Sequence, residues 1–274
     1  MTTLRSKFVE ALRRLGARPR LLPLLALYQG APTVKPTFAF LLREASARKG
    51  VFLYRVRENG MRAAIRHRRG DVVILGEVFN HHDYRPTGEV ERALTQVSNI
   101  VDLGGNIGLF GLFAAARWPD AKIIAFEPDP DNAAIHERTI AANGLAERWQ
   151  LVQAAACNEN GRASFVAGLA AVSHIADPTE GEQTIEVPLI DVLPQIAQAD
   201  LLKMDIEGGE WAILGDPRFR EAPPRAVVLE YHSHLSPGPD SRADAEAALR
   251  AAGMQIQPIS YRDDGHGMLW AWRA

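Results

Sequence analysis

An apolar run at residues 99–108 breaks into closely spaced glycines, and this break decides more about the fold than any other segment. It reads Asn-Ile-Val-Asp-Leu-Gly-Gly-Asn-Ile-Gly, which is typical of the turn between a β-strand and a following helix. Glycine tolerates a positive φ angle and lacks the Cβ atom that would hold a ligand away from the backbone. The start of the helix would also offer unpaired N–H groups. The segment therefore predicts a site for a polar ligand.

The order of the glycines and a second acidic residue narrow the kind of ligand. Gly104, Gly105 and Gly108 follow Asp102, a spacing that differs from the dinucleotide fingerprint Gly-x-Gly-x-x-Gly, so an NAD-dependent oxidoreductase is disfavoured. The next apolar run, residues 122–127, ends in Glu127, at about the distance that one helix and one strand require. Glu127 is placed to accept hydrogen bonds from two adjacent ribose hydroxyls.

From residue 99 onward, apolar strands alternate with helical segments, which predicts a parallel sheet covered on both faces. A helix is expected at residues 129–143, because acidic residues and a proline open it and Asn143-Gly144 closes it. Two inserted strands are expected at residues 163–166 and 184–189, and a closing antiparallel hairpin at 255–260 and 268–272. The main strands are expected at residues 99–103, 122–127, 150–156, 201–205 and 226–230.

The chain before residue 99 has a different pattern. Apolar residues at helical spacing predict helices at residues 4–15 and 37–47, and Asn59-Gly60 between two alternating runs predicts a hairpin of residues 51–57 and 61–66. A third short strand is expected at residues 72–75. Because this region lacks a convincing core, we expect an N-terminal extension of helices and a small sheet over residues 1–95, followed by the ligand-binding domain over residues 96–274.

Composition and charge limit the partners and the compartment. The net charge of −2 over 274 residues gives no overall basic field, so nucleic acid is not an expected partner. The basic run at residues 66–69 is interpreted as a solvated loop rather than an anion site. A single cysteine, Cys157, fits a reducing, cytoplasmic compartment. Residues 1–27 contain no long uncharged segment, so no signal peptide and no membrane span are expected.

Three segments carry a resemblance to a known family. They are Val-Asp-Leu-Gly-Gly-Asn-Ile-Gly at 101–108, Ala-Phe-Glu-Pro-Asp-Pro at 125–130, and Leu-Lys-Met-Asp-Ile-Glu-Gly-Gly-Glu at 202–210. On these the chain resembles the FkbM-type methyltransferases, and the pattern Lys-x-Asp-x-Glu-Gly-x-Glu in the third is close to a signature of that family. The resemblance covers residues 77–231. It implies a Rossmann-like class I methyltransferase fold, with a seven-stranded, mostly parallel α/β sheet whose last strand is antiparallel.

The resemblance also implies S-adenosylmethionine as the cofactor and a role for each matching position. The bend at Gly104 and Asn106 would face the methionine part and Glu127 would hold the ribose. Wider relatives often carry an acid where Ala156 and Cys157 would meet adenine, and this chain has none there. The expected cofactor contacts are Asp102, Gly104, Gly105, Asn106, Gly108, Glu127, Pro128, Ala156, Cys157 and Asp205.

Members of the family mostly methylate hydroxyl groups of natural products or sugars, and a neutral alcohol needs a base near its oxygen. His232, just after the strand at residues 226–230, is the first choice for that base, although a surface histidine is the alternative. Asp205, at the carboxyl end of its strand, would serve as base or orient the acceptor. Lys203 lies on the same face of its strand as Asp205, and it is either catalytic or one member of an architectural ion pair. Glu230 completes the catalytic candidates.

The candidate acceptor contacts are less closely specified. His82 and Tyr84 precede the glycine bend, and His234 and Glu207 follow the two strands that end at the predicted site. Glu207 and Glu210 would equally suit the start of a helix. A metal held by Asp205, Glu230 and His232 would have suitable ligand types, but an adjacent carboxylate pair is missing, so no required metal is expected.

Two other functions remain open from the sequence: methylation of a nitrogen or a carboxylate, and binding of the cofactor without catalysis. A small molecule or sugar is the expected acceptor. The N-terminal extension is expected either to help cover the acceptor site or to form a homodimer contact, because its first helix is amphipathic and it lacks an independent core.

Overall fold

The computed structural model describes residues 26–46, 50–166 and 184–273. The chain divides into two compact units, Met1–His82 and Asp83–Ala274. The division lies earlier in the chain than the boundary at residue 95 that the sequence suggested. The helix expected at residues 4–15 lies outside the described residues. Within the described residues, no helix has the length and apolar character needed to cross a lipid bilayer.

The first unit contains a three-stranded antiparallel sheet in the order β1-β2-β3, which confirms the expected hairpin. A small polar and aromatic core, which the sequence did not predict, lies within it. The ring centroids of Phe40 and Tyr54 are 5.1 Å apart, and the buried His67 lies 2.7 Å from both Tyr54 Oη and Glu44 Oε2. The elements of this unit are η1 (Ala26–Gly30), α3 (Ala31–Thr33), β1 (Val34–Lys35), α4 (Thr37–Ala45), β2 (Val51–Val56), β3 (Arg62–Arg66), α5 (Asp71–Gly76) and η2 (Glu77–His81).

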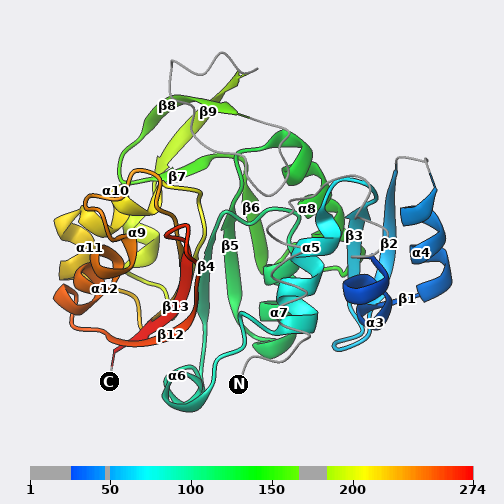
Figure 1. The fold of residues 1–274 in the computed structure, drawn as a ribbon, viewed down its shortest axis with the longest axis horizontal. Helices are drawn as coiled ribbons and strands as arrows, with labels where there is room; N and C mark the ends of the chain where they lie inside the picture. The colour runs from blue at the N-terminus through cyan, green and yellow to red at the C-terminus, as the bar shows by residue number, and fades with distance from the viewer. Residues whose placement is uncertain (1–25, 47–49, 167–183, 274) are drawn as a thin grey trace. The chain divides into compact units, whose positions relative to one another are not determined.

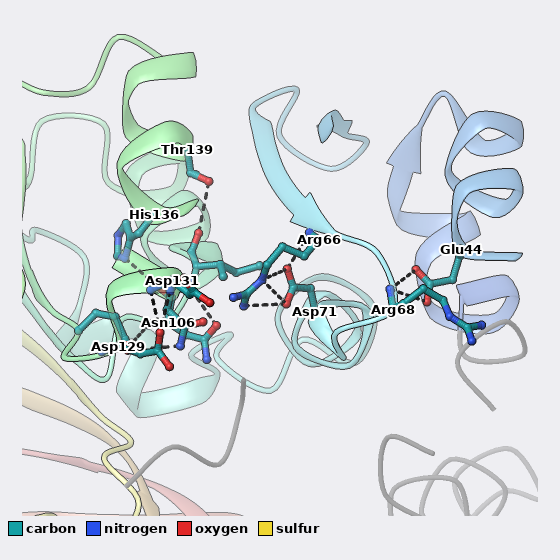
Figure 2. Close-up of polar contacts among 12 residues, drawn as sticks. Glu44, Arg66, Arg68, Asp71, Asn106, Asp129, Asp131, His136 and Thr139 are labelled. Carbon is teal, nitrogen blue, oxygen red and sulfur yellow. Dashed lines mark hydrogen bonds and ion pairs between the residues drawn. The ribbon is translucent and has the colours of Figure 1, made fainter. Parts of the chain in front are cut away.

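The strand expected at residues 72–75 is wrong, because this segment forms the helix α5. Gly70 adopts a left-handed φ of 87° that turns the chain. The buried carboxylate of Asp71 then accepts a hydrogen bond from Arg66 N at 2.8 Å and pairs with the Arg66 guanidinium at 3.0 Å (Figure 2). Four apolar residues have no periodicity that separates strand from helix. The contacts of Asp71 therefore decide the conformation.

The second unit is built on a seven-stranded sheet with the order β12-β13-β11-β10-β4-β5-β6. β4, β5, β6, β10 and β11 run parallel, whereas β13 is antiparallel to both of its neighbours. This confirms the expected mixed α/β fold and its closing hairpin. The strands are β4 (Asn99–Leu103), β5 (Lys122–Phe126), β6 (Trp149–Val152), β10 (Leu201–Met204), β11 (Ala226–Tyr231), β12 (Gln255–Tyr261) and β13 (Gly267–Trp272).

Helices cover this sheet on both faces, as a parallel sheet of apolar strands requires. α9 to α12 gather on one side in Figure 1, and Trp211, Phe219 and Leu249 on them join the core formed by β4, β10 and β11. α7 contacts β5 and α8 contacts β6. The helices are α6 (Gly88–Ala93), α7 (Leu109–Arg117), α8 (Pro130–Ala142), α9 (Leu193–Ile196), α10 (Glu210–Gly215), α11 (Pro217–Glu221) and α12 (Ser241–Ala251).

The single strand expected at residues 150–156 is two strands. β6 ends at Val152 within the main sheet, and β7 (Ala155–Cys157) pairs instead with β9 (Thr184–Asp191), which also pairs with β8 (Gly161–Val166). A tight turn, in which Ala154 N donates to Val152 O at 3.0 Å, separates the two strands. The small sheet β7-β9-β8 brings Phe165 to the edge where the main strands end.

Candidate functional site

A pocket opens where β4, β5 and β10 end, the edge at which open α/β sheets bind ligands. The space between its walls, open solvent at the mouth included, is about 590 Å³. Its walls are formed by Gly104, Asn106, Phe126, Glu127, Pro128, Asn132, Ala155, Ala156, Phe165, Asp205, Ile206, Glu207 and Gly209.

Most of the residues that the sequence placed at the site line this pocket. The predicted positions in its walls are Gly104, Asn106, Glu127, Pro128, Ala156, Asp205 and Glu207. Four predicted cofactor contacts lie outside the walls, namely Asp102, Gly105, Gly108 and Cys157. Asp102 is fully buried in β4, a central strand whose two faces are both covered.

The glycine bend has a backbone that requires glycine. Gly104 has a φ of 76°, and a Cβ atom there would lie 1.8 Å from the carbonyl oxygen of Asp205. Gly108 has a φ of 86°. Glycine at the first position therefore lets the bend pack directly against the end of β10.

The sequence predicted unpaired N–H groups at the start of the following helix, α7, whereas those of the bend itself have partners within the protein. Gly104 N and Gly105 N donate to Phe126 O at 3.0 and 2.9 Å, and Gly108 N donates to Gly105 O at 2.9 Å. Asn106 N donates to Glu127 Oε2 at 2.7 Å. The carboxylate of Glu127 thus satisfies the N–H group of Asn106, and the four N–H groups named here are all paired within the protein.

His136 supports the bend from behind, and the sequence analysis missed it. Its Nδ1 lies 3.0 Å from Asn106 O (Figure 2). A Cβ atom at Gly105 or Gly108 would lie 2.8 or 2.7 Å from the His136 ring. Burial lowers the pKa of His136 to about 3, so the ring is neutral and Nδ1–H donates to the carbonyl. A polar stripe at helical spacing on α8, Asn132, His136 and Thr139, was the available signal.

Glu127 is a buried carboxylate held in one orientation. Its Oε1 accepts hydrogen bonds from Asp129 N at 2.9 Å and Asn132 Nδ2 at 3.3 Å, in addition to the bond from Asn106 N to Oε2. Burial raises its pKa to about 7 in spite of these donors. An ionised carboxylate has about four acceptor positions, so Glu127 keeps capacity for a ligand hydroxyl at the pocket wall.

Lys203 joins the bend to the carboxylates of β4 and β10. Its Nζ donates to Leu103 O at 3.1 Å and Gly104 O at 2.6 Å, and lies 3.4 Å from Asp102 Oδ1 and 3.6 Å from Asp205 Oδ2. Burial alone would lower the pKa of Lys203, but the surrounding carboxylates raise it above its usual value. These contacts favour the architectural interpretation of Lys203 over a direct part in catalysis.

His232 lies among three carboxylates beside the pocket. Its Nδ1 is 3.0 Å from Glu210 Oε1, and its Nε2 is 3.3 Å from Glu207 Oε2 and 4.0 Å from Asp205 Oδ1. Burial by itself would lower the pKa of His232, but the hydrogen bond to Glu210 and the three negative charges together raise it to about 10. His232 is therefore an imidazolium at neutral pH, and its Nε2 faces the carboxylates of Asp205 and Glu207.

The remaining candidates lie outside the pocket walls. Glu230 is partly buried, and its charge raises the pKa of Lys203. His234 is exposed, and its carbonyl accepts a hydrogen bond from Trp211 Nε1 at 3.0 Å. Tyr84 is buried against Phe110, with ring centroids 5.3 Å apart.

His82 belongs to the first unit, where its Nδ1 lies 3.6 Å from Glu58 Oε2.

Comparison with known proteins agrees with this geometry. The Methyltransferase FkbM domain matches residues 102–256, which include most of the glycine bend, Glu127 and the segment at 202–210. The curated protein methyltransferase sdnD of Sordaria araneosa is 40% identical over 70 residues, which are 26% of this chain and 25% of sdnD. Methyltransferase 1 of Beauveria bassiana is 26% identical over 146 residues, or 43% of this chain and 57% of that protein.

The matches thus span only part of these curated relatives. Among solved structures, an O-methyltransferase family protein from Burkholderia thailandensis aligns with a TM-score of 0.42 and 12% identity, over 76% of this chain and 60% of that one. The domain match confirms the expected family and, with it, S-adenosylmethionine as the cofactor.

Proposed function

We propose that this chain, which belongs to the FkbM methyltransferase family, transfers a methyl group from S-adenosylmethionine to a hydroxyl group of a small molecule or a sugar. One observation carries the proposal. A single pocket holds the oriented carboxylate of Glu127, the bare backbone of Gly104, and two further carboxylates, Asp205 and Glu207. The first two fit a ribose and the amino acid part of the cofactor, and the last two fit an acceptor that loses a proton.

The residues present fit the cofactor. Glu127 would accept a hydrogen bond from a ribose hydroxyl, since its three protein donors leave one of about four acceptor positions free. Gly104 would contact the methionine part through its backbone, which lines the pocket. Ala156 and Phe165 give the pocket an apolar wall suited to a purine base. When bound, S-adenosylmethionine supplies an activated methyl group on a sulfonium sulfur.

Asp205 and Glu207 would act on the acceptor. Methyl transfer to an alcohol releases the hydroxyl proton, and a carboxylate within hydrogen-bond reach can receive it. Both side chains are about a quarter exposed, with relative accessibilities of 27% and 25%, so they are reachable from the pocket mouth. The imidazolium of His232 would hold the two carboxylates in place, which makes it a positioning residue. This reassigns the proton acceptor from His232, the base expected from the sequence.

A second candidate acceptor is an amine. The carboxylates of Asp205, Glu207 and Glu210 around one histidine give the pocket mouth an excess of negative charge, which favours a cationic acceptor. Amine and hydroxyl acceptors of the same carbon skeleton therefore need to be compared directly.

The test is to incubate the chain with S-adenosylmethionine and matched panels of hydroxyl and amine acceptors, and to measure S-adenosylhomocysteine by mass spectrometry. We expect product with a hydroxyl acceptor and a large loss of turnover, with little change in cofactor affinity, in Asp205→Asn. Product from amines alone would move the assignment to nitrogen methylation. Cofactor binding without product from any acceptor would indicate a binding protein and overturn the proposal.

A further inference from the structure

We propose that Asp205, Glu207 and His232 form a binding site for one divalent metal ion at the mouth of the pocket. Each residue offers one ligand atom, and these atoms all lie within 4.8 Å of one another. His232 Nε2 is 3.3 Å from Glu207 Oε2 and 4.0 Å from Asp205 Oδ1. Two atoms that bind the same metal ion at about 2.1 Å, with a right or a tetrahedral angle between the bonds, lie about 3.0–3.4 Å apart. Small side-chain movements would therefore close the three groups around an ion.

The histidine of this set is held as metal-binding histidines usually are. His232 has a side-chain exposure of only 7%, and its Nδ1 lies 3.0 Å from Oε1 of the fully buried Glu210. The same oxygen accepts a hydrogen bond from His232 N at 2.7 Å. A carboxylate on the far nitrogen fixes the tautomer and points the other nitrogen at the metal. Here that other nitrogen, Nε2, is directed at two carboxylates, and a bound metal ion would displace the proton that Nε2 carries in the free protein.

The backbone at Glu207 is strained in the conformation that places its side chain in this set. Glu207 has a φ of 52° and Gly208 a φ of 101°, and a non-glycine residue in the left-handed region costs about 1 kcal/mol or more. Gly208 N donates to Glu210 Oε2 at 2.9 Å, so the carboxylate that orients His232 also fixes the strained turn. One buried side chain thus holds two of the three ligands in place, as preorganised sites require.

The ligand chemistry specifies the class of ion. One imidazole nitrogen with two carboxylate oxygens suits Mn²⁺, Zn²⁺ or Fe²⁺ better than Ca²⁺ or Mg²⁺, which prefer oxygen ligands alone. The set differs from the one weighed on sequence grounds, because Glu207 takes the place of Glu230. An ion here would lie where the acceptor enters, and it would lower the pKa of a bound hydroxyl. Only this consequence rests on the proposed function, whereas the binding itself is independent of it.

In the experiment, the metal-stripped full chain is titrated with Mn²⁺ in the absence of cofactor. Binding is measured by isothermal titration calorimetry and by electron paramagnetic resonance. We expect one Mn²⁺ per chain, a coupling from one imidazole nitrogen in the pulsed spectrum, and affinity at least tenfold weaker in Glu207→Gln. The control is Glu89→Gln, an exposed glutamate paired with Arg92 on α6, which should bind like wild type.

Two outcomes would overturn the proposal: no bound Mn²⁺, or binding that keeps its affinity in Glu207→Gln and shows no nitrogen coupling. The nitrogen coupling is measured on the unaltered protein, so it does not depend on whether a variant folds. Binding of S-adenosylmethionine is measured on the same sample. If the unaltered protein binds S-adenosylmethionine but no Mn²⁺, only the metal site is refuted. If it does not bind S-adenosylmethionine, the proposed function is refuted.

Discussion

Replacing Lys203 by methionine should destabilise the second unit by about 3–5 kcal/mol, the cost of leaving a buried charge without its partner. Methionine keeps the length of the side chain but removes the ammonium group. The fully buried carboxylate of Asp102 would then lose its ion pair at 3.4 Å, and the carbonyls of Leu103 and Gly104 would lose their donor. Because these contacts join β4 to β10 at the centre of the sheet, relaxation of the backbone cannot replace them.

Urea denaturation measures this effect, with tryptophan fluorescence as the probe. All five tryptophans of the chain lie after residue 83, so the signal reports the second unit. The matched control is Lys122→Met, which removes an exposed lysine from β5 and should change the free energy of unfolding by less than about 0.5 kcal/mol. The double variant Lys203→Met with Asp102→Asn should recover part of the loss, because the unpaired charge is gone.

A decrease of less than about 1 kcal/mol in the free energy of unfolding of Lys203→Met would refute this reasoning. It would mean that the ion pair contributes no more than an exposed one. A double variant less stable than Lys203→Met alone would equally contradict the role given to the charge of Asp102.

Three further predictions follow from the site. His136 has a folded pKa of about 3 against about 6.5 when unfolded, so the unfolded chain binds more protons between these values and stability falls as the pH falls. From pH 6.5 to 5.0 this histidine should lower the free energy of unfolding by about 2 kcal/mol. In urea denaturation, the free energy of unfolding of His136→Gln should therefore fall by about 2 kcal/mol less than that of wild type over the same pH range. Equal decreases in the two proteins would contradict the assignment. Glu127 has a pKa of about 7 in the free protein, and its ionised form accepts a hydrogen bond from the ribose. Calorimetry should therefore show that the affinity for S-adenosylmethionine rises up to about tenfold from pH 6 to 8. A dissociation constant that is flat over this range would count against it. Glu210→Gln should lower the pKa of His232 and shift the pH profile of turnover without changing cofactor affinity; an NMR titration that finds the histidine pKa unchanged would disprove this coupling.

The sequence was sufficient for the fold wherever strands are apolar and well separated. Alternating strands and helices after residue 99 gave the parallel sheet, and the paired runs near the C-terminus gave the antiparallel hairpin β12 and β13. It failed where a short apolar run had no periodicity, as in α5, and where one run was divided between two sheets, as in β6 and β7. The contact of Asp71 with the nearby Arg66 fixes α5, whereas β7 is fixed by pairing with β9, which is distant in the chain.

The site was predictable where a motif residue follows directly on a strand. Glu127 and Asp205 come from the ends of β5 and β10, and the structure places both in the pocket wall. His136 and the contact between Glu210 and His232 were not predictable in the same way, because they depend on how α8 and α10 pack. A motif gives the identity of a residue, but its partner and its charge state come from the tertiary structure.

The most direct test of the central claim is the dissociation constant for S-adenosylmethionine, measured by calorimetry for wild type, Glu127→Ala and the control Glu137→Ala. Glu137 is an exposed residue of α8. One hydrogen bond to an ionised carboxylate contributes about 2 kcal/mol, so Glu127→Ala should weaken binding about 30-fold, whereas the control should bind like wild type. An unchanged dissociation constant in Glu127→Ala would contradict the account.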